Sequence, residues 1–573
     1  MATREHTGRW RYLAVTALAG FGFYGFLLML LPRPQLGVFG GDQGVKYLQI
    51  ESIAEGHPWL SNKAEEIDPE RNFYPLRAPF AFTEDGKIYS VYLNPITYLA
   101  APAFRVAGVE GCTWLTVMSA VGIALAAAAL GHSVTRRSLD SVALGIFVLV
   151  GTPVWFYGAV FWEHAPAVFP GLVATAILCR ERITTFGVTL AGALTGFAAA
   201  SRPEAAMYLA AVVLAWAIAT RKLRKPAWLL LVGILVWLAL NTALRGASFT
   251  EHLRLNYISV DVFLESRRSY AERLLGGFLA SSGGTNLQMM IPGLAASAGV
   301  LVFVGLIAGR AVWVAACSLG VVVVIASAVP ALLSARDGST QLTGLLSSCP
   351  LVALGLLFSG AVARRGFSRA ARPAEQRASF LSLTVLLFLS AAIALTPNDG
   401  GNQWGARYLL YAYPLLSLIV LAFFRSSFVP ASATLRTLAG AVLVVAVATS
   451  LTVQAVGVRN YIDMIQNKTS ALARITELPG RYVLTPLWFV PQEAALLSVA
   501  NDKIFLLVQS PSQLGSAISK LAQAGQESFA FVESSRTPHG SRRWRSYAEG
   551  AGFSFYMHPF ELRVTPFRTD TTG

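Results

Sequence analysis

Charged residues are scarce in this chain: Asp, Glu, Lys and Arg make up only 13% of its 573 residues, against about 25% in soluble domains. The chain also lacks a Gly-rich phosphate-binding fingerprint, so nothing indicates a nucleotide site. Its four cysteines have no metal-site spacing and imply no disulfide framework. We interpret them as buried thiols. No internal repeat is visible.

Apolar sequence is abundant instead, at 54% of the residues. Apolar runs of about 18 to 25 residues recur along most of the chain, and each can cross a hydrocarbon core about 30 Å thick. Glycine is frequent, with 49 residues, which suits close helix packing in lipid. The first run, residues 12–31, is too long for a signal peptide, and no cleavage site follows it. The sequence therefore predicts an all-α polytopic membrane protein.

The formal net charge of +15 indicates orientation rather than nucleic-acid binding. With the N-terminus in the cytoplasm, the inner loops hold 19 Lys or Arg and only 4 Asp or Glu, as expected for cytoplasmic loops. The high Ala, Gly and Arg content is typical of bacteria. We expect a protein of the bacterial plasma (inner) membrane with no nucleic-acid partner.

About thirteen spans fit this orientation. The segment 92–108 is apolar but short and contains Pro95, Pro102 and Arg105, so we interpret it as an interfacial or re-entrant helix. The predicted spans are residues 12–31, 112–131, 141–158, 165–179, 185–201, 205–220, 227–244, 291–309, 311–333, 343–362, 380–396, 406–424 and 437–457. This leaves two large outer loops, 32–111 and 245–290, and the second reads as an amphipathic interfacial segment.

The C-terminal region has a different pattern, in which short apolar strands alternate with helical stretches. Such alternation predicts a small α/β domain, and the topology places it outside the cytoplasm. We therefore expect a transmembrane domain over residues 1–458 and an extracytoplasmic α/β domain over residues 459–573.

Unusual polar residues gather at the outer ends of the predicted spans. They are Asp42, Lys46, Glu163, His164, Arg202, Glu204, Arg336, Asp337 and the segment from Asn398 to Arg407. Ionisable groups at membrane depth are costly and usually mark a site or a path. Because all of these fall on one predicted face, they indicate a cavity open to the outside.

Four sequence blocks follow one another on this outer side. They are Gly41-Asp42-Gln43 with Lys46-Tyr47, Asn94-Pro95-Ile96-Thr97-Tyr98, Gly276-Gly277-Phe278 with Gly284, and Gln403-Trp404-Gly405-Ala406-Arg407-Tyr408-Leu409. In this order they resemble the GT-C type integral membrane glycosyltransferases, which use polyprenyl-phosphate sugars, and in particular the superfamily of protein-mannosyl and aminoarabinose transferases. The resemblance covers residues 41–414, and the family also has a similar layout of helices and an outer α/β domain.

Two positions depart from the family pattern. Gln43 stands where a second acid is usual, which weakens a two-carboxylate metal site. Leu93 or Asn94 stands in place of a lysine that contacts the donor phosphate in some branches. We therefore do not assign the chain to the aminoarabinose branch.

The resemblance implies an inverting transferase that moves a sugar from a polyprenyl-phosphate-linked donor to an extracytoplasmic glycan, lipid or protein. A carboxylate must accept the proton of the attacking hydroxyl, and Asp42 is the expected general base. The alternative role of Asp42 is to cap a helix that begins near Gln43. Lys46 and Tyr47 follow within a turn and are expected to contact substrate, although Lys46 can instead form a helix ion pair with Asp42.

Cations must stabilise the leaving phosphate, and arginine suits this task. Arg202 follows a predicted span and either contacts the phosphate, pairs with Glu204 or reaches the lipid headgroups. Arg407 begins the predicted span 406–424, where a helix N-terminus attracts anions. The other expected donor- or substrate-binding residues are Glu163, His164, Glu204, Gln403, Trp404 and Tyr408.

The sequence requires no cofactor. If the reaction uses a divalent metal, Asp42, Glu163 and His164 are the candidate ligands, but two adjacent side chains alone are weak evidence for a metal site. The alternative role of Glu163 and His164 is interfacial anchoring.

Two other functions compete with glycosyl transfer. One is a transporter or flippase of lipid-linked sugars, although transporters tend to have internal repeats and broken helices at the membrane midplane. The other is a non-catalytic membrane scaffold that presents the C-terminal domain. It leaves the outward polar residues unexplained.

Overall fold

The computed structural model describes residues 2–244, 342, 344–366, 371–396, 403–425, 433–534, 553–557 and 560–568. Several predictions lie outside these described residues: the outer loop 245–290 with the third sequence block, the spans 291–309 and 311–333, Arg336, Asp337 and residues 398–402. The chain divides into two compact units. Unit 1 contains the described residues of Met1–Leu28, Thr113–Leu244 and Tyr257–Asn460, and unit 2 those of Met29–Cys112 and Tyr461–Gly573.

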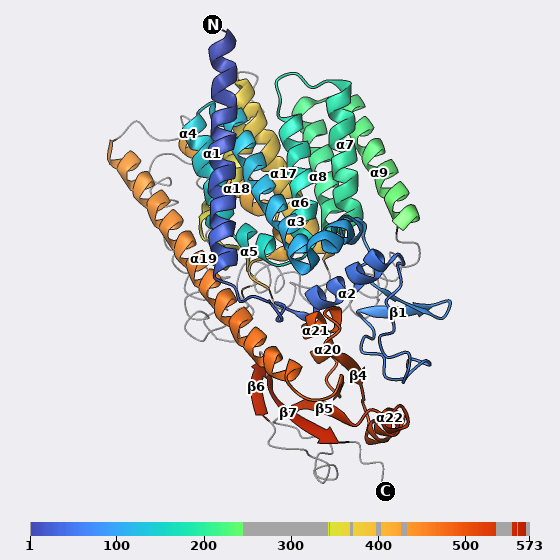
Figure 1. Cartoon of the computed structure of the whole chain (residues 1–573). Helices are drawn as coiled ribbons and strands as arrows, with labels where there is room; N and C mark the ends of the chain where they lie inside the picture. Colours follow the sequence, from blue (N-terminus) through green and yellow to red (C-terminus); the bar gives the residue numbers. More distant parts are fainter. Residues whose placement is uncertain are drawn as a thin grey trace. The chain divides into compact units, whose positions relative to one another are not determined.

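Unit 1 is built from apolar helices. They are α1 (Ala2–Met29), α4 (Ser138–Val150), α5 (Val154–Ala159), α6 (His164–Leu178), α7 (Thr185–Ser201), α8 (Pro203–Thr220), α9 (Arg224–Leu244), α15 (Leu345–Ser348), α16 (Leu351–Gly366), α17 (Pro373–Leu395) and α18 (Ala412–Arg425). Two long helices, α3 (Pro95–Thr135) and α19 (Ala433–Thr476), belong partly to each unit. Figure 1 shows α6, α7, α8 and α9 running side by side.

Within the described part of the chain, six helices are long and apolar enough to cross a membrane. The predicted helical, multi-pass character of the chain is therefore confirmed at this level, while the number of thirteen spans remains a prediction. The described cysteines Cys112, Cys179 and Cys349 are buried and form no disulfide.

Proline interrupts two spans that were predicted as continuous. The predicted span 141–158 is wrong, because α4 ends at Val150 and α5 begins after Pro153. The predicted span 343–362 is also wrong, since Pro350 separates α15 from α16. Proline has no amide hydrogen to donate and disfavours the helical region for the residue before it. Apolar length alone did not reveal these breaks.

The helix α3 is broken where the prediction separated an interfacial segment from a span. Ala107 and Gly108 have non-helical backbone angles inside it. The φ of Gly108 is 56° with ψ at −142°, a conformation that is accessible essentially to glycine alone. The break divides the Pro95 end of the helix from the apolar stretch that leads to Thr135.

The last predicted helix, 437–457, is too short, because α19 continues to Thr476. Gly457 does not end the helix. A Cβ atom at this position would collide with the indole ring of Trp404, so the glycine permits close packing within unit 1.

Unit 2 contains a five-stranded sheet in the order β4-β3-β5-β7-β6. Its strands are β3 (Tyr482–Thr485), β4 (Ile504–Leu507), β5 (Ser528–Ser534), β6 (Phe553–Met557) and β7 (Phe560–Arg568). The β3 strand runs parallel to β4 and β5, whereas β7 is antiparallel to β5 and β6. Three further helices belong to this unit: α20 (Val490–Glu493), α21 (Ala495–Val499) and α22 (Pro511–Gln523).

Successive side chains along each strand point to opposite faces of the sheet, and other elements cover both faces. One face packs Leu484, Leu506 and Phe531 against Leu514, Ala517 and Leu521 of α22. The other packs Val483, Phe505 and Ala530 against Leu472 and Ile475 of α19 and against Val490 and Leu497. Burial on both faces explains why these strands read as nearly continuous apolar runs.

The segment that was predicted as the first outer loop folds into the same unit. It contains α2 (Gly41–Glu55) and a hairpin of β1 (Ala81–Glu84) and β2 (Lys87–Ser90). Asp85 and Gly86 form the two-residue turn of this hairpin. Their φ values, 49° and 71°, are both positive, as a type I′ turn requires. Ala64, Ile67 and Phe73 share a hydrophobic core with the C-terminal sheet.

Candidate functional site

Asp42 lies in the first turn of α2, and Gly40 occupies the N-cap position. The alternative prediction that Asp42 caps this helix is therefore wrong. Gln43 instead reaches back to the start of the helix, where its Oε1 accepts a hydrogen bond from the Phe39 amide at 2.8 Å. A carboxylate in the first turn is favoured by the helix dipole. The half-buried side chain of Asp42 thus does not have to satisfy the cap.

Two glycines on either side of Asp42 hold α2 against α20. A Cβ atom on Gly41 would collide with the side chain of Gln492, and one on Gly44 would collide with the Gln492 carbonyl oxygen. The glycines of the first sequence block therefore serve close packing within unit 2. This packing determines where the helix that carries Asp42 begins.

A buried ion pair fixes the chain just before Asp42. Lys468 Nζ lies 2.6 Å from Glu493 Oε2 and donates to the carbonyl oxygens of Val38 and Phe39. Because removing one partner of a buried ion pair is costly, this lysine anchors the segment to α19 and α20. No sequence pattern points to this pair, since its two residues are separated in sequence and belong to different helices.

Lys46 and Tyr47 are buried in unit 2. Lys46 Nζ lies 4.3 Å from the centre of the Tyr92 ring, a favourable cation–π geometry. The Tyr47 hydroxyl accepts a hydrogen bond from Gln43 Nε2 at 3.4 Å. Both side chains are thus placed by contacts inside the unit, and their expected contacts with substrate remain predictions.

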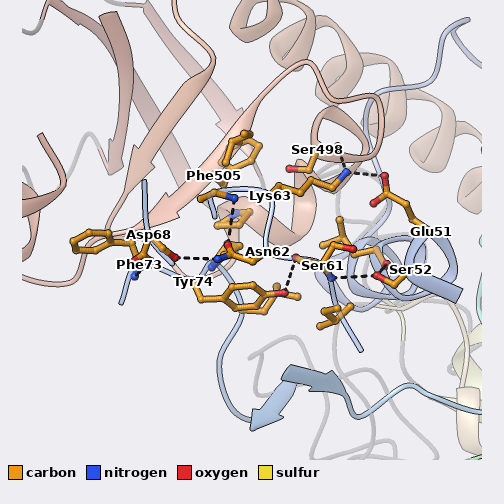
Figure 2. Close-up of a pocket in the computed structure, with 17 residues that line it drawn as sticks. Glu51, Ser52, Ser61, Asn62, Lys63, Asp68, Phe73, Tyr74, Ser498 and Phe505 are labelled. Atoms are coloured by element: carbon orange, nitrogen blue, oxygen red, sulfur yellow. Dashed lines mark hydrogen bonds and ion pairs between the residues drawn. The ribbon is translucent and has the colours of Figure 1, made fainter. Parts of the chain in front are cut away.

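A small pocket lies further along α2 (Figure 2). Lys63 Nζ is 2.6 Å from Glu51 Oε1 and also donates to the carbonyl oxygen of Ser498. Burial raises the pKa of the Glu51 carboxyl, while the neighbouring Lys63 ammonium lowers it. The cavity measures about 40 Å³, enough for a few water molecules and too little for a sugar. We therefore exclude it as the substrate site.

A buried group of charged side chains in unit 1 surrounds Arg202. Its Nη1 lies 3.1 Å from Glu163 Oε1, and its Nε lies 2.9 Å from Glu204 Oε1. His164 Nε2 is 3.7 Å from the same Glu204 oxygen. All four residues are buried. We call these four residues the Arg202 cluster.

Three helix ends bring the Arg202 cluster together. Glu163 precedes α6 and His164 is its first residue. Arg202 is the residue between α7 and α8, where Pro203 takes the first helical position, a position that proline favours. The predicted outer loop around Glu163 and His164 is therefore a helix start, and the predicted pairing of Arg202 with Glu204 is present.

Aromatic rings surround the cluster and include two residues that the sequence analysis did not select. The rings of Tyr157 and Trp162 lie 5.3 and 5.7 Å from the His164 ring. The guanidinium of Arg407 lies 5.8 Å from the Trp162 ring and 4.9 Å from the Tyr408 ring. Arg407 Nη2 also donates to the Tyr408 hydroxyl at 3.0 Å. The aromatic residues just before Glu163 were the visible signal for this arrangement.

Arg407 does not begin a long helix. It starts a three-residue 3-10 turn, Arg407–Leu409, and α18 begins only at Ala412. The predicted span 406–424 is wrong at its start, so the attraction of a helix N-terminus for an anion does not apply to Arg407. The turn before it depends on Gly405, whose φ is 82° and whose missing Cβ leaves room for Pro153.

Trp404 is held by α19. Its Nε1 donates to Gln454 Oε1 at 3.0 Å, and the same oxygen accepts from Trp155 Nε1 at 2.8 Å. Gln403 is buried, and its carbonyl oxygen accepts from the Leu342 amide. Gln454 was not identified from the sequence, because a glutamine inside an apolar helix has no recognisable motif.

The structure therefore brings part of the predicted site together in each unit. In unit 1 it joins Glu163, His164, Arg202, Glu204, Arg407 and Tyr408. Asp42, Lys46 and Tyr47 belong to unit 2.

A metal site is not assembled by the described residues, which contain no group of three or more His, Cys, Asp or Glu side chains suited to a metal ion. Of the candidate ligands, Glu163 is paired with Arg202, and His164 lies beside Glu204. The Arg202 cluster thus matches a network of ion pairs better than a metal centre.

Comparison with known proteins gives no match in sequence: no family model and no curated protein matches the chain. Solved structures do match. The apo structure of ArnT from Cupriavidus metallidurans has 11% identity and a TM-score of 0.51, covering 100% of this chain and 99% of ArnT.

Two further structures are similar. ArnT bound to undecaprenyl phosphate has 13% identity and a TM-score of 0.44, with 98% of each chain covered. The archaeal oligosaccharyltransferase AglB from Archaeoglobus fulgidus, in complex with an inhibitory peptide and a dolichol-phosphate, has 12% identity and a TM-score of 0.47, covering 93% of this chain and 70% of AglB. The end-to-end match to apo ArnT shows that this chain shares the ArnT fold, which agrees with the resemblance to GT-C type proteins seen in the sequence.

Proposed function

We propose that the protein is a bacterial inner-membrane glycosyltransferase that moves a sugar from a polyprenyl-phosphate-linked donor to an extracytoplasmic acceptor. The observation that supports this most strongly is the Arg202 cluster, with Arg407 beside it, inside a unit of apolar helices. Buried ionisable groups in such a unit are costly and usually functional. The cytoplasmic N-terminus and the extracytoplasmic C-terminal domain follow from the positive charge of the inner loops.

The donor class is supported by the fold and by its ligands in other proteins. ArnT of Cupriavidus metallidurans binds undecaprenyl phosphate, and AglB binds a dolichol-phosphate. A donor of this kind carries its sugar already activated, so the absence of a nucleotide fingerprint is expected. The acceptor is a glycan, a lipid or a protein outside the cytoplasm.

The proposed reaction is a single displacement with inversion. A hydroxyl oxygen of the acceptor attacks the anomeric carbon, and Asp42 takes the hydroxyl proton. The bond from the anomeric carbon to the phosphate oxygen breaks, and polyprenyl phosphate leaves with the bonding electrons.

Arg407 is the proposed cation for the leaving phosphate. Its side chain is half-buried and lies across two aromatic rings, and a guanidinium offers several donors to a phosphate. Arg202 forms ion pairs with two carboxylates, those of Glu163 and Glu204. We therefore propose that it positions these side chains. Lys46, Tyr47, Glu163, His164, Glu204, Gln403, Trp404 and Tyr408 remain proposed substrate-binding residues.

The decisive experiment compares wild type with Asp42→Asn in a deletion strain. Envelope glycans and polyprenyl-phosphate sugars are extracted and analysed by mass spectrometry. We expect the deletion to remove one sugar from a glycan and to accumulate the matching lipid-linked sugar. Asp42→Asn should fail to repair this defect, with transfer reduced by about 100-fold or more, although it folds and inserts normally. Repair equal to wild type would refute Asp42 as the base.

A second measurement separates a transferase from a transporter. Purified protein in detergent is mixed with the lipid-linked sugar that accumulates in the deletion strain and with the glycan that lacks the sugar. A transferase consumes the donor in detergent, whereas a transporter has no second compartment and changes nothing. Failure of wild type to consume the donor would favour the transporter.

A further inference from the structure

A second arginine-rich region of unit 1 surrounds an open cavity. It lies among the ends of α3, α16 and α18 and the start of α17 and measures about 310 Å³, within the range of small-ligand sites. Five arginines line it: Arg136, Arg137, Arg365, Arg372 and Arg425. Glu375 is the single acidic residue among the described lining residues. We call this region the basic cavity.

The carboxylates near the basic cavity do not balance its arginines. Glu375 Oε1 is shared by Arg365 Nε and Arg372 Nη2, each at 3.0 Å. Asp140 pairs with Arg425 at 2.6 Å, and Glu181 pairs with Arg136. Within the described part of the chain, Arg137 forms no ion pair and its side chain is exposed. The cavity therefore keeps an excess of positive charge.

The residues that line the basic cavity indicate which kind of anion it can bind. Guanidinium groups bind phosphate with paired hydrogen bonds in a fixed geometry. Apart from Thr135, the remaining lining residues are small and apolar: Val134, Val362, Ala374, Ala378 and Ala422. A phosphate joined to an apolar group satisfies both parts of the lining. A wholly polar anion would leave the apolar walls without a partner.

The position of the cavity in unit 1 separates it from the Arg202 cluster. The two regions lie at opposite ends of α18. Arg407, which lies beside the Arg202 cluster, precedes the start of this helix at Ala412, and Arg425 of the basic cavity is its last residue. The helix has 14 residues and is therefore about 21 Å long. The arginines of the basic cavity fall in the loops that the charge pattern assigns to the cytoplasmic side, where basic pockets between membrane helices bind anionic headgroups.

We propose that the basic cavity binds a phosphate group, and that an anionic phospholipid headgroup supplies it. This inference rests on the lining residues alone and does not require the protein to be a glycosyltransferase. Free phosphate has the same charged chemistry but lacks the apolar part, so the test includes both ligands.

The test compares two double variants of the full-length protein. Arg137→Gln with Arg372→Gln removes two charges from the cavity. The matched control, Arg182→Gln with Arg224→Gln, removes two exposed charges on the same predicted side of the membrane but outside the cavity. Native mass spectrometry in detergent measures binding of palmitoyl-oleoyl phosphatidylglycerol and of the matching phosphatidylcholine. Thermal unfolding with and without inorganic phosphate provides the second arm and also reports whether each variant is folded.

We expect wild type and the control to bind phosphatidylglycerol at least tenfold more tightly than phosphatidylcholine, since each basic residue near an anionic headgroup contributes about 1 kcal/mol. The cavity variant should lose this preference. Inorganic phosphate could raise the melting temperature of wild type but not of the cavity variant, while wild type binds phosphatidylglycerol no more tightly than phosphatidylcholine. That result would support the phosphate site and overturn the phospholipid as its source. If neither ligand distinguishes the cavity variant from the control, the proposal is overturned.

Discussion

Unit 1 uses arginine in two different ways. In the Arg202 cluster the arginine side chain is 8% exposed and its two carboxylate partners are 4% and 5% exposed. In the basic cavity Arg365, Arg425 and Arg372 are 33%, 47% and 69% exposed. A buried charge must be matched by partners, whereas an exposed charge is screened by solvent and salt. The first group is therefore arranged by the protein itself, and the second is available to an outside anion.

The strongest test of this comparison is removal of the Arg202 charge. Arg202→Met leaves Glu163 and Glu204 buried together without their shared cation. We expect a loss of about 3–5 kcal/mol in the free energy of unfolding, measured as a lower melting temperature of the detergent-purified protein. Arg202→Lys keeps the charge but loses the two-point geometry, so it should recover part of the loss. If Arg202→Met changes the free energy of unfolding by less than about 1 kcal/mol, the ion pairs of the cluster contribute no more than exposed surface ion pairs.

Arg407 tests whether function and stability separate beside the cluster. In Arg407→Gln, we expect kcat/KM for sugar transfer to fall by about 100-fold, as when one donor to a developing negative charge is removed. The melting temperature should change little, because Arg407 is half-buried. A larger loss of activity in the variant than in wild type after mild heating would instead indicate a structural role. The assay is donor consumption in detergent at a temperature where both proteins are folded.

Glu204→Gln should have a smaller effect than loss of the arginine. The amide oxygen can still accept from Arg202 Nε, and Glu163 remains to balance the guanidinium. We expect a loss of about 1 kcal/mol, typical of one weakened hydrogen bond, in the same melting experiment. A loss as large as that of Arg202→Met would show that both carboxylates, and not the arginine alone, hold the helix ends together.

The exposed ion pair between Arg136 and Glu181 should matter least for stability. The two side chains are 42% and 67% exposed, and such pairs contribute about 0–1 kcal/mol. Arg136→Gln should therefore change the melting temperature only slightly, and the difference should shrink further in high salt. A large, salt-independent shift would show that the basic cavity is stabilised by its own ion pairs and is not an open anion site.

Much of the helical framework could be predicted, because it depends on local apolar length. The predicted span 185–201 coincides with α7, and the predicted span 165–179 lies within one residue of α6. The predictions failed where one residue overrides the apolar pattern. Pro153 and Pro350 interrupt helices, whereas Gly457 does not, since it packs under Trp404. Composition over a window does not distinguish these cases.

The sequence selected several residues that the structure brings together in unit 1, but it did not predict their arrangement. Asp42 and Arg407 were selected by the sequence, yet the N-cap role of Asp42 and the helix-start position of Arg407 were both wrong. Gln454, Trp162 and Lys468 were missed, because each acts through a partner that is distant in sequence or belongs to another element.

The sequence by itself determined that this chain is rich in membrane-length apolar helices, and its charge asymmetry predicts how they are oriented, because both properties are local and additive along the chain. Only the tertiary structure decided that Arg202 bridges Glu163 and Glu204, while Arg137 stays exposed in a cavity. Each of these arginines borders a helix in a similar sequence context. Burial and partners differ because they depend on which helix ends meet, and that is set by packing over the whole unit.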